Sequence, residues 1–260
     1  MKANSLQALV EQFISEYRGG SLTSWWRKPL VGVAEAQDPL FRVLKRKHGF
    51  LLPEEIVNSA RSVVVIFLPF AEWIVESNLN PGPASREWAL AYLEANQLLT
   101  NLADWLAETL EMKGFKSKPI APTGEFDEEA LISNWSHKHA AYVAGLGSLG
   151  VHHMLITEEG CCGRLVSIVT EALLNHRTEP LEEACLHKLG FECLKCVANC
   201  QFGALTATKL NKQKCYEVCL SNAKLYIDLG LADVCGKCAC GLPCSLKKPT
   251  ADIERKLFYS

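Results

Sequence analysis

The sequence predicts an α+β protein, in which an α/β domain over residues 1–180 precedes a small cysteine-rich domain over residues 181–246 and a tail over residues 247–260. Apolar residues recur at helical spacing around one β-branched run in the first part, which is typical of mixed helix and sheet. All 12 cysteines lie at or after Cys161, so the chain divides where they begin. The 260 residues are 48% apolar and 22% charged, which excludes disordered, collagen-like and coiled-coil classes.

The first predicted elements are a helix and a buried strand. Apolar residues share one face of the helix at Leu6, Leu9, Val10, Phe13 and Tyr17. Gly19-Gly20 follows and is expected to end the helix. The run SVVVIFLP at Ser62–Pro69 is short, β-branched and without alternation, which predicts a strand buried on both faces.

A long helix is predicted after the breaker at residues 81–83, with Ser85 as its N-cap and an end near Gly114. Its core face consists of Trp88, Tyr92, Leu99, Leu102, Trp105, Leu106 and Leu110. We expect a further helix over Glu128–Val143, then neighbouring strands at Met154–Thr157 and Leu165–Thr170. A basic turn and a short terminal helix are expected in the tail.

Charge and hydropathy exclude several function classes. The net charge of −2 provides no general basic field for nucleic acid. The longest apolar run falls well short of the roughly 20 residues that span a bilayer, so no membrane partner is expected. Glu11 and Glu16 interrupt the N-terminal segment, which lacks the pattern of a secretory signal. We therefore expect a cytoplasmic protein whose thiols bind metal rather than form disulfides.

The spacing Cys185-x7-Cys193-x2-Cys196-x3-Cys200 is similar to the iron–sulfur run C-x2-C-x2-C-x3-C. Gly190 stands where the first cysteine of that run is expected. Cys185 is the nearby thiol that can replace it, which implies a loop between Cys185 and Cys193.

Eight of the cysteines are enough for two [4Fe–4S] clusters in the crossed arrangement of two-cluster ferredoxins. The first predicted ligand set is Cys185, Cys193, Cys196 and Cys244. The second is Cys200, Cys215, Cys235 and Cys238. Cys240 competes with Cys244, which we prefer because Pro243 and the wider spacing suit a ligand that reaches back. Cys219 and the vicinal pair Cys161-Cys162 are expected to be non-ligands.

Zinc is the alternative metal. The pairs Cys193-x2-Cys196 and Cys235-x2-Cys238 would also satisfy a zinc ribbon. We favour iron–sulfur clusters because the three-residue step to Cys200 and the total of eight ligands distribute into two linked sites.

The glycines Gly145, Gly147 and Gly150 match the dinucleotide fingerprint G-x-G-x-x-G. That fingerprint requires a strand before the glycines and a helix after them. Here the preceding segment is predicted to be helical and the following one to be a strand, which argues against nucleotide binding. A tight helix-to-strand turn remains the simplest alternative role.

The chain also resembles a known family. The segments that carry the resemblance are Ala60–Phe70, Ala144–Gly150, Met154–Thr157 and the cysteine run. They are similar to the cobalamin-dependent iron–sulfur reductases typified by epoxyqueuosine reductase, with reductive dehalogenases as more distant relatives. The resemblance covers most of residues 55–246, and Trp135–His139 (WSHKH) places the chain in a shorter branch. It implies a nitroreductase-like domain that holds base-off cobalamin, followed by a ferredoxin-like domain with two [4Fe–4S] clusters.

The resemblance also implies site residues. The residues expected near the corrinoid are Gly145, Gly147, Ser148, Gly150, His152 and Met154. The family's acidic residue would fall on Leu131, so the acid cannot be transferred. His137, His139 and Tyr142 are the catalytic candidates instead, because histidine titrates near neutral pH. The alternative is that both histidines only hydrogen-bond a buried corner.

The function implied is a reductase that passes electrons through two clusters to cobalamin and on to a small organic substrate, with epoxyqueuosine-like reduction as the leading named reaction. A ferredoxin- or flavodoxin-like donor is expected, and no nucleic-acid partner except transfer RNA. The alternative is a non-catalytic electron-transfer protein, or one that reactivates a partner corrinoid protein.

Overall fold

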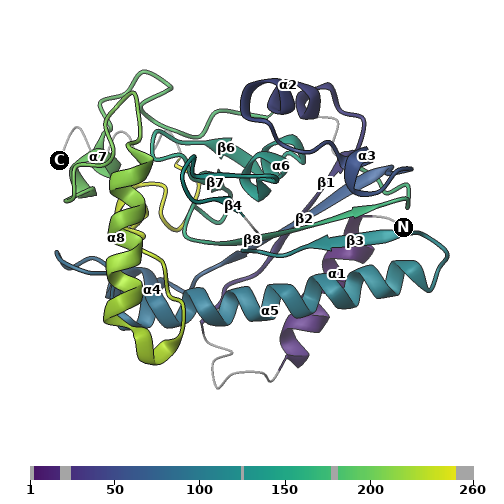
Figure 1. The fold of residues 1–260 in the computed structure, drawn as a ribbon, viewed down its shortest axis with the longest axis horizontal. Helices are drawn as coiled ribbons and strands as arrows, with labels where there is room; N and C mark the ends of the chain where they lie inside the picture. The colour runs from purple at the N-terminus through teal and green to yellow at the C-terminus, as the bar shows by residue number, and fades with distance from the viewer. Residues whose placement is uncertain (1–2, 18–24, 124–125, 177–180, 250–260) are drawn as a thin grey trace. The chain divides into compact units, whose positions relative to one another are not determined.

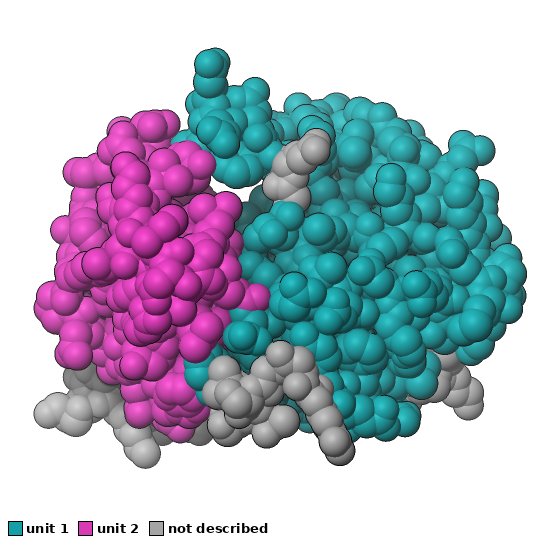
Figure 2. Space-filling model, turned by 60° about the horizontal axis from the view of Figure 1, so that its bottom comes forward, with its two compact units in different colours: residues 1–68, 94–146, 163–180 teal, residues 69–93, 147–162, 181–260 magenta. Residues whose placement is uncertain are grey.

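The computed structural model describes most of the chain, at residues 3–17, 25–123, 126–176 and 181–249. The predicted helix end at Gly19-Gly20, the predicted domain boundary at residue 180 and the predicted terminal helix lie outside these residues. The chain forms two compact units, which Figure 2 colours separately. Unit 1 comprises residues 1–68, 94–146 and 163–180, and unit 2 comprises residues 69–93, 147–162 and 181–260.

Unit 1 is built on a four-stranded sheet in the order β1-β2-β8-β3. The strands are β1 (Leu30–Glu35), β2 (Ser62–Pro69), β3 (Ser117–Ile120) and β8 (Gly163–Thr170). β1 pairs antiparallel with β2, and β3 pairs antiparallel with β8. At the two ends of the central pair, the Arg61 N–H donates to the Thr170 carbonyl and the Phe70 N–H donates to the Cys162 carbonyl. These bonds make β2 and β8 antiparallel, so the whole sheet is antiparallel and the fold is α+β as predicted.

Every residue of β2 is buried, which confirms the prediction of a strand covered on both faces. Figure 1 shows α1 (Ala3–Glu16) and α5 (Arg86–Glu111) on one side of the sheet. It shows α2 (Pro39–His48) and α6 (His137–Val143) on the other. A short helix, α3 (Pro53–Ile56), precedes β2. Helices on both sides explain why an antiparallel strand carries no polar face.

The long helix α5 starts where the sequence predicts. The Oγ of Ser85 accepts the Trp88 N–H at 3.1 Å, which is the expected N-cap bond. Six of the seven residues of the predicted stripe are buried, including Leu99, Leu102 and Leu110, whereas Trp105 is half-buried. Within unit 1, the Phe13 ring of α1 packs 5.1 Å from the Trp105 ring of α5, centroid to centroid.

The helix predicted over Glu128–Val143 is wrong in its first half. α6 begins only at His137, and residues before it form the hairpin β4 (Phe126–Asp127) and β5 (Ile132–Ser133). The Asp127 side chain accepts the backbone N–H groups of residues 129 and 130 at 2.9 and 2.8 Å. Such local bonds compete with helix formation, and Leu131 adopts a left-handed φ of 51°.

The predicted pairing of the two late strands is also wrong. β7 (Leu155–Thr157) pairs with β6 (Gly147–Leu149) in a separate two-stranded sheet of unit 2. β8 lies instead between β2 and β3 in unit 1. The short connection after β6 favours a local hairpin over a longer-range partner.

Besides that hairpin, the regular structure of unit 2 is helical. Its helices are α4 (Glu72–Ser77), the first residues of α5, α7 (Lys195–Asn199), α8 (Lys212–Leu225), and the 3-10 turns η1 (Ile227–Leu229) and η2 (Lys237–Ala239). One of its cores is small, with Cys196, Leu205 and Leu242 at its centre. Buried Asn78 joins two segments, because its Nδ2 donates to the Cys235 carbonyl at 2.9 Å and its Oδ1 accepts the Ser85 N–H at 3.0 Å. In the described part of the chain, no helix has the length and apolar character needed to cross a membrane.

Candidate metal centre

Four thiols of the first predicted ligand set line one pocket in unit 2: Cys185, Cys193, Cys196 and Cys244. Burial, and to a smaller extent the nearby thiols of Cys244 and Cys185, together raise the pKa of Cys196 to about 11. The pKa of Cys193 is raised by burial first and then by the same two thiols. Charges perturb each other in this way at short range. The structure therefore brings the first predicted set together.

Local structure positions these thiols. Cys193 precedes α7 and Cys196 lies within it. The Cys185 carbonyl accepts the Leu189 N–H at 3.1 Å, and Gly190 follows with a left-handed φ of 95°. The chain thus makes the loop between Cys185 and Cys193 that their spacing requires.

The second predicted set also converges within unit 2. Burial, and to a smaller extent the thiols of Cys235, Cys215 and Cys200, together raise the pKa of Cys238 to about 12. Burial also raises the pKa of Cys235, with Cys215 and Cys200 among the smaller causes. Cys200 follows the last residue of α7, Cys215 lies on α8, and Cys235 and Cys238 lie before and within η2.

Helix α7 connects the two sets. It carries Cys196 of the first set, and Cys200 of the second set is its C-cap. The Cys196 thiol is also one of the groups that raise the pKa of Cys238. The three-residue step between Cys196 and Cys200 therefore places two four-thiol groups next to each other.

Cys240 and Cys244 have different surroundings in unit 2. Cys240 is buried, and its Sγ accepts the Asn78 Nδ2 at 3.6 Å. Cys244 lines the pocket of the first set. Cys244, the preferred choice from the sequence, thus lies with the other three thiols of the first set, whereas Cys240 does not line their pocket.

Three thiols outside the predicted sets also lie close to them. The side chains of Cys161 and His152 form a group with Cys244, in which the ligand atoms lie within 4.8 Å of one another. The Cys162 thiol donates to the Ala239 carbonyl at 3.1 Å. A hydrogen bond with Cys219 lowers the pKa of Cys215 to about 7. In the sequence, the one signal for the contact between Cys215 and Cys219 was their four-residue spacing, which places them on one face of a helix.

The glycine run is packed against the protein itself. Gly147 lies in β6, where an added Cβ would be 2.1 Å from the Ile156 carbonyl oxygen. An added Cβ at Gly150 would be 2.7 Å from Cε1 of His152. Gly145, with a φ of 73°, lies in the turn after α6. The order of helix and then strand is the reverse of a dinucleotide-binding turn, as the sequence predicts.

The remaining residues predicted near a corrinoid have other surroundings. Ser148 is 2% exposed, and its hydroxyl donates to Glu183 at 2.8 Å and accepts the Ala184 N–H at 2.8 Å. His152 is 3% exposed and contacts Cys244, whereas the Met154 side chain is 39% exposed. The side chains of Ser148 and His152 are therefore buried and engaged with other residues of unit 2.

The three catalytic candidates lie on α6 but have separate partners. His137 contacts the Ser167 hydroxyl through Nδ1 at 2.8 Å and the Ala121 carbonyl through Nε2 at 2.9 Å. Burial lowers the pKa of His137 to about 4. His139 contacts the Ser136 hydroxyl at 2.7 Å, and its ring centroid lies 5.4 Å from that of His48. The Tyr142 side chain is exposed.

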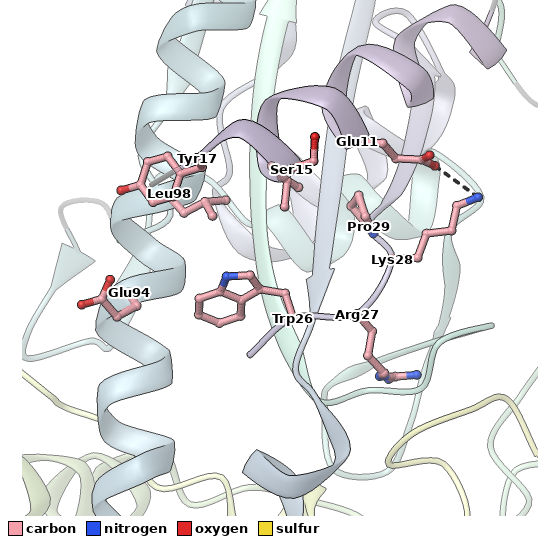
Figure 3. A pocket seen from close by; sticks show the side chains of 10 residues that line it. Glu11, Ser15, Tyr17, Trp26, Arg27, Lys28, Pro29, Glu94 and Leu98 are labelled. Carbon is pink, nitrogen blue, oxygen red and sulfur yellow. Dashed lines mark ion pairs between the residues drawn. The ribbon is translucent and has the colours of Figure 1, made fainter. Parts of the chain in front are cut away.

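A cavity of about 410 Å³ lies elsewhere in unit 1, between α1, α5 and the segment before β1 (Figure 3). Glu11 and Lys28 form an ion pair of 3.2 Å at this cavity, and Tyr17, Trp26 and Glu94 also line it. Its described lining includes none of the predicted ligands or catalytic candidates.

Comparison with known proteins identifies the fold. No protein-family model and no curated protein matches the sequence. Three matching solved structures are epoxyqueuosine reductases. A selenomethionine-labelled one is 19% identical with a TM-score of 0.58, and the match covers 96% of this chain and 70% of that one. The enzyme from Bacillus subtilis is 18% identical with a TM-score of 0.55, over 95% and 67% of the two chains.

A third structure contains an epoxyqueuosine-modified stem loop of tyrosine transfer RNA. It is 20% identical with a TM-score of 0.54, and the match covers 96% of this chain and 70% of that one. The match thus extends over both compact units and the segments that carry the sequence resemblance. The chain therefore has the fold of the epoxyqueuosine reductases, and the resemblance predicted from its motifs is confirmed.

Proposed function

We propose that this protein is an iron–sulfur reductase with two [4Fe–4S] clusters. One observation carries the proposal: eight cysteines converge as two groups of four that share α7. The first cluster would be held by Cys185, Cys193, Cys196 and Cys244. The second would be held by Cys200, Cys215, Cys235 and Cys238.

The donor chemistry fits two cubanes. Each group supplies four thiols, the number that a [4Fe–4S] cluster requires. Burial and neighbouring thiols raise the pKa of Cys196 and Cys238, so these side chains are costly to ionise without a metal. Binding of metal removes that cost and therefore couples cluster assembly to the folding of unit 2. Two neighbouring clusters then provide a one-electron path along α7.

Base-off cobalamin is the electron acceptor that the sequence resemblance implies. When bound, it supplies a strongly reducing metal centre. The residues predicted to contact it do not form a common cradle, because the side-chain positions of Gly147 and Gly150 are filled by backbone and side-chain atoms of unit 2. Ser148 and His152 are engaged with Glu183 and Cys244.

The proposed substrate is an epoxyqueuosine-like nucleoside in transfer RNA, because one structure of the same fold was solved with such a stem loop. A ferredoxin- or flavodoxin-like protein would supply the electrons. His139 is the better proton donor of the two histidines, because a pKa of about 4 leaves His137 uncharged at neutral pH.

A second candidate function is electron transfer or corrinoid reactivation without a substrate of its own. The contacts that fill the glycine run favour it, because they leave the predicted corrinoid residues without a shared cradle. Both functions require the clusters but differ in the acceptor.

The test uses the full chain, purified without air and reduced with dithionite. Bleaching of a broad visible absorption and a paramagnetic signal support the clusters. Cobalamin is then added, and electron paramagnetic resonance detects whether its lower base dissociates. Base dissociation together with turnover of a modified stem loop supports the reductase. Cluster reduction with neither result supports the second candidate, and a spectroscopically silent zinc protein contradicts both.

A further inference from the structure

The side chain of His152 touches the sulfur of a proposed cluster ligand. Its Nε2 lies 3.5 Å from the Sγ of Cys244, and both residues belong to unit 2. His152 is 3% exposed, so water does not compete for this contact. Any role of this contact in the cluster rests on the proposed role of Cys244 as a ligand of the first cluster.

The hydrogen bond at the other ring nitrogen determines which nitrogen of His152 carries the proton. The Met154 N–H donates to Nδ1 of His152 at 3.0 Å. A nitrogen that accepts a hydrogen bond carries no proton, so the neutral ring carries its proton on Nε2. Nε2 is therefore a donor, and the contact with Cys244 is an N–H···S hydrogen bond.

The third glycine of the run leaves space for this ring. A Cβ at Gly150 would lie 2.7 Å from Cε1 and 3.1 Å from Nδ1 of His152, and 3.0 Å from Cδ1 of Ile156. Any side chain at this position would therefore push the imidazole from its place. This contact gives Gly150 a role that needs neither a nucleotide nor a corrinoid.

We infer that His152 is a positioning residue that tunes the first cluster through its hydrogen bond to the Cys244 sulfur. Reduction adds one electron to the cluster and makes its ligand sulfurs more negative. A donor to such a sulfur stabilises the reduced form more than the oxidised form, and hydrogen bonds to sulfur are a known determinant of cluster potential. His152 therefore raises the reduction potential of the first cluster and leaves that of the second unchanged.

The experiment is a redox titration of the full chain without air, followed by electron paramagnetic resonance and paired with iron analysis. His152→Phe keeps a ring but removes the donor. We expect full iron content, with one of the two midpoint potentials lowered and the other unchanged. The reduced-to-oxidised ratio of that cluster at a fixed potential should fall about tenfold, which is about 59 mV for a one-electron couple. His152→Gln restores an N–H donor and should recover part of the shift.

Two further variants separate tuning from general damage. Gly150→Ala displaces the ring without removing it, and should lower the same potential by a smaller amount. His153→Asn is the matched control, because it changes an exposed neighbouring histidine whose φ of 62° asparagine tolerates. It should leave both potentials unchanged.

The outcomes distinguish the inference from the proposed function. Unchanged potentials in His152→Phe with full iron content overturn the inference alone. Loss of metal in both His152→Phe and His152→Gln also overturns it, because His152 would then be a ligand of a metal shared with Cys161 and Cys244. A wild-type protein without iron–sulfur clusters overturns the proposed function before any variant is compared.

Discussion

Replacing Gly236 by alanine should destabilise the loop that carries two ligands of the second proposed cluster. An added Cβ would lie 2.4 Å from Cε2 of Trp88, which overlaps an indole ring. Trp88 is 5% exposed and packs edge-on against Phe70 with ring centroids 5.0 Å apart, so it cannot swing aside freely. Overpacking of this kind costs about 1–3 kcal/mol. Gly236 also has a φ of 73°, which costs a non-glycine residue about 1–2 kcal/mol.

The free energy of unfolding should therefore fall by about 2–5 kcal/mol in Gly236→Ala. Gly190→Ala is the matched control, because Gly190 has a φ of 95° and nothing lies within 4 Å of its added Cβ. Its free energy of unfolding should fall only by the cost of a left-handed φ, about 1–2 kcal/mol. Urea titration without air measures both values, and loss of iron to a chelator should be faster in Gly236→Ala. Equal losses of stability in the two variants would refute the role of the Trp88 contact.

Three further outcomes are expected. Cys196→Ser should lose about four of eight irons and destabilise unit 2, whereas Cys219→Ser should keep its iron. Iron analysis measures both variants, and equal iron contents would contradict the ligand assignment. Between pH 6.5 and pH 4, His137 is protonated in the unfolded chain but stays neutral in the folded one. The free energy of unfolding should therefore fall by about 1–2 kcal/mol as the pH is lowered over this range, after allowance for solvent screening. Denaturant titrations over this range should show a shallower pH dependence in His137→Gln, and an identical dependence would exclude His137 as the cause. His139→Phe should retain both clusters but slow turnover at pH 7, and an unchanged rate would remove His139 from the proton-donor role.

The elements that the sequence predicted well are those with a strong local pattern. The eight-residue run of β2 is apolar throughout, and the stripe of α5 follows an N-cap at Ser85. Such signals do not depend on distant residues. The cysteine spacing likewise led to two groups that the structure brings together, because α7 links Cys196 to Cys200 within one short helix.

The failures have equally specific causes. Helix periodicity before α6 was overridden by hydrogen bonds that the Asp127 carboxylate accepts from the following backbone N–H groups, which stabilise a turn. The sheet position of β8 depends on partners that are distant in the sequence, which no local pattern encodes. The bond from His152 to Cys244 spans 92 residues, so the sequence offered only the adjacent glycines as a signal.

The iron and acid-labile sulfide content of the full chain, purified without air, tests directly whether the eight thiols hold two clusters. Two groups of four thiols that each hold a [4Fe–4S] cluster predict about eight irons and about eight sulfides per chain, together with a brown colour. A natively folded, colourless protein that contains zinc in place of iron and sulfide would contradict the account.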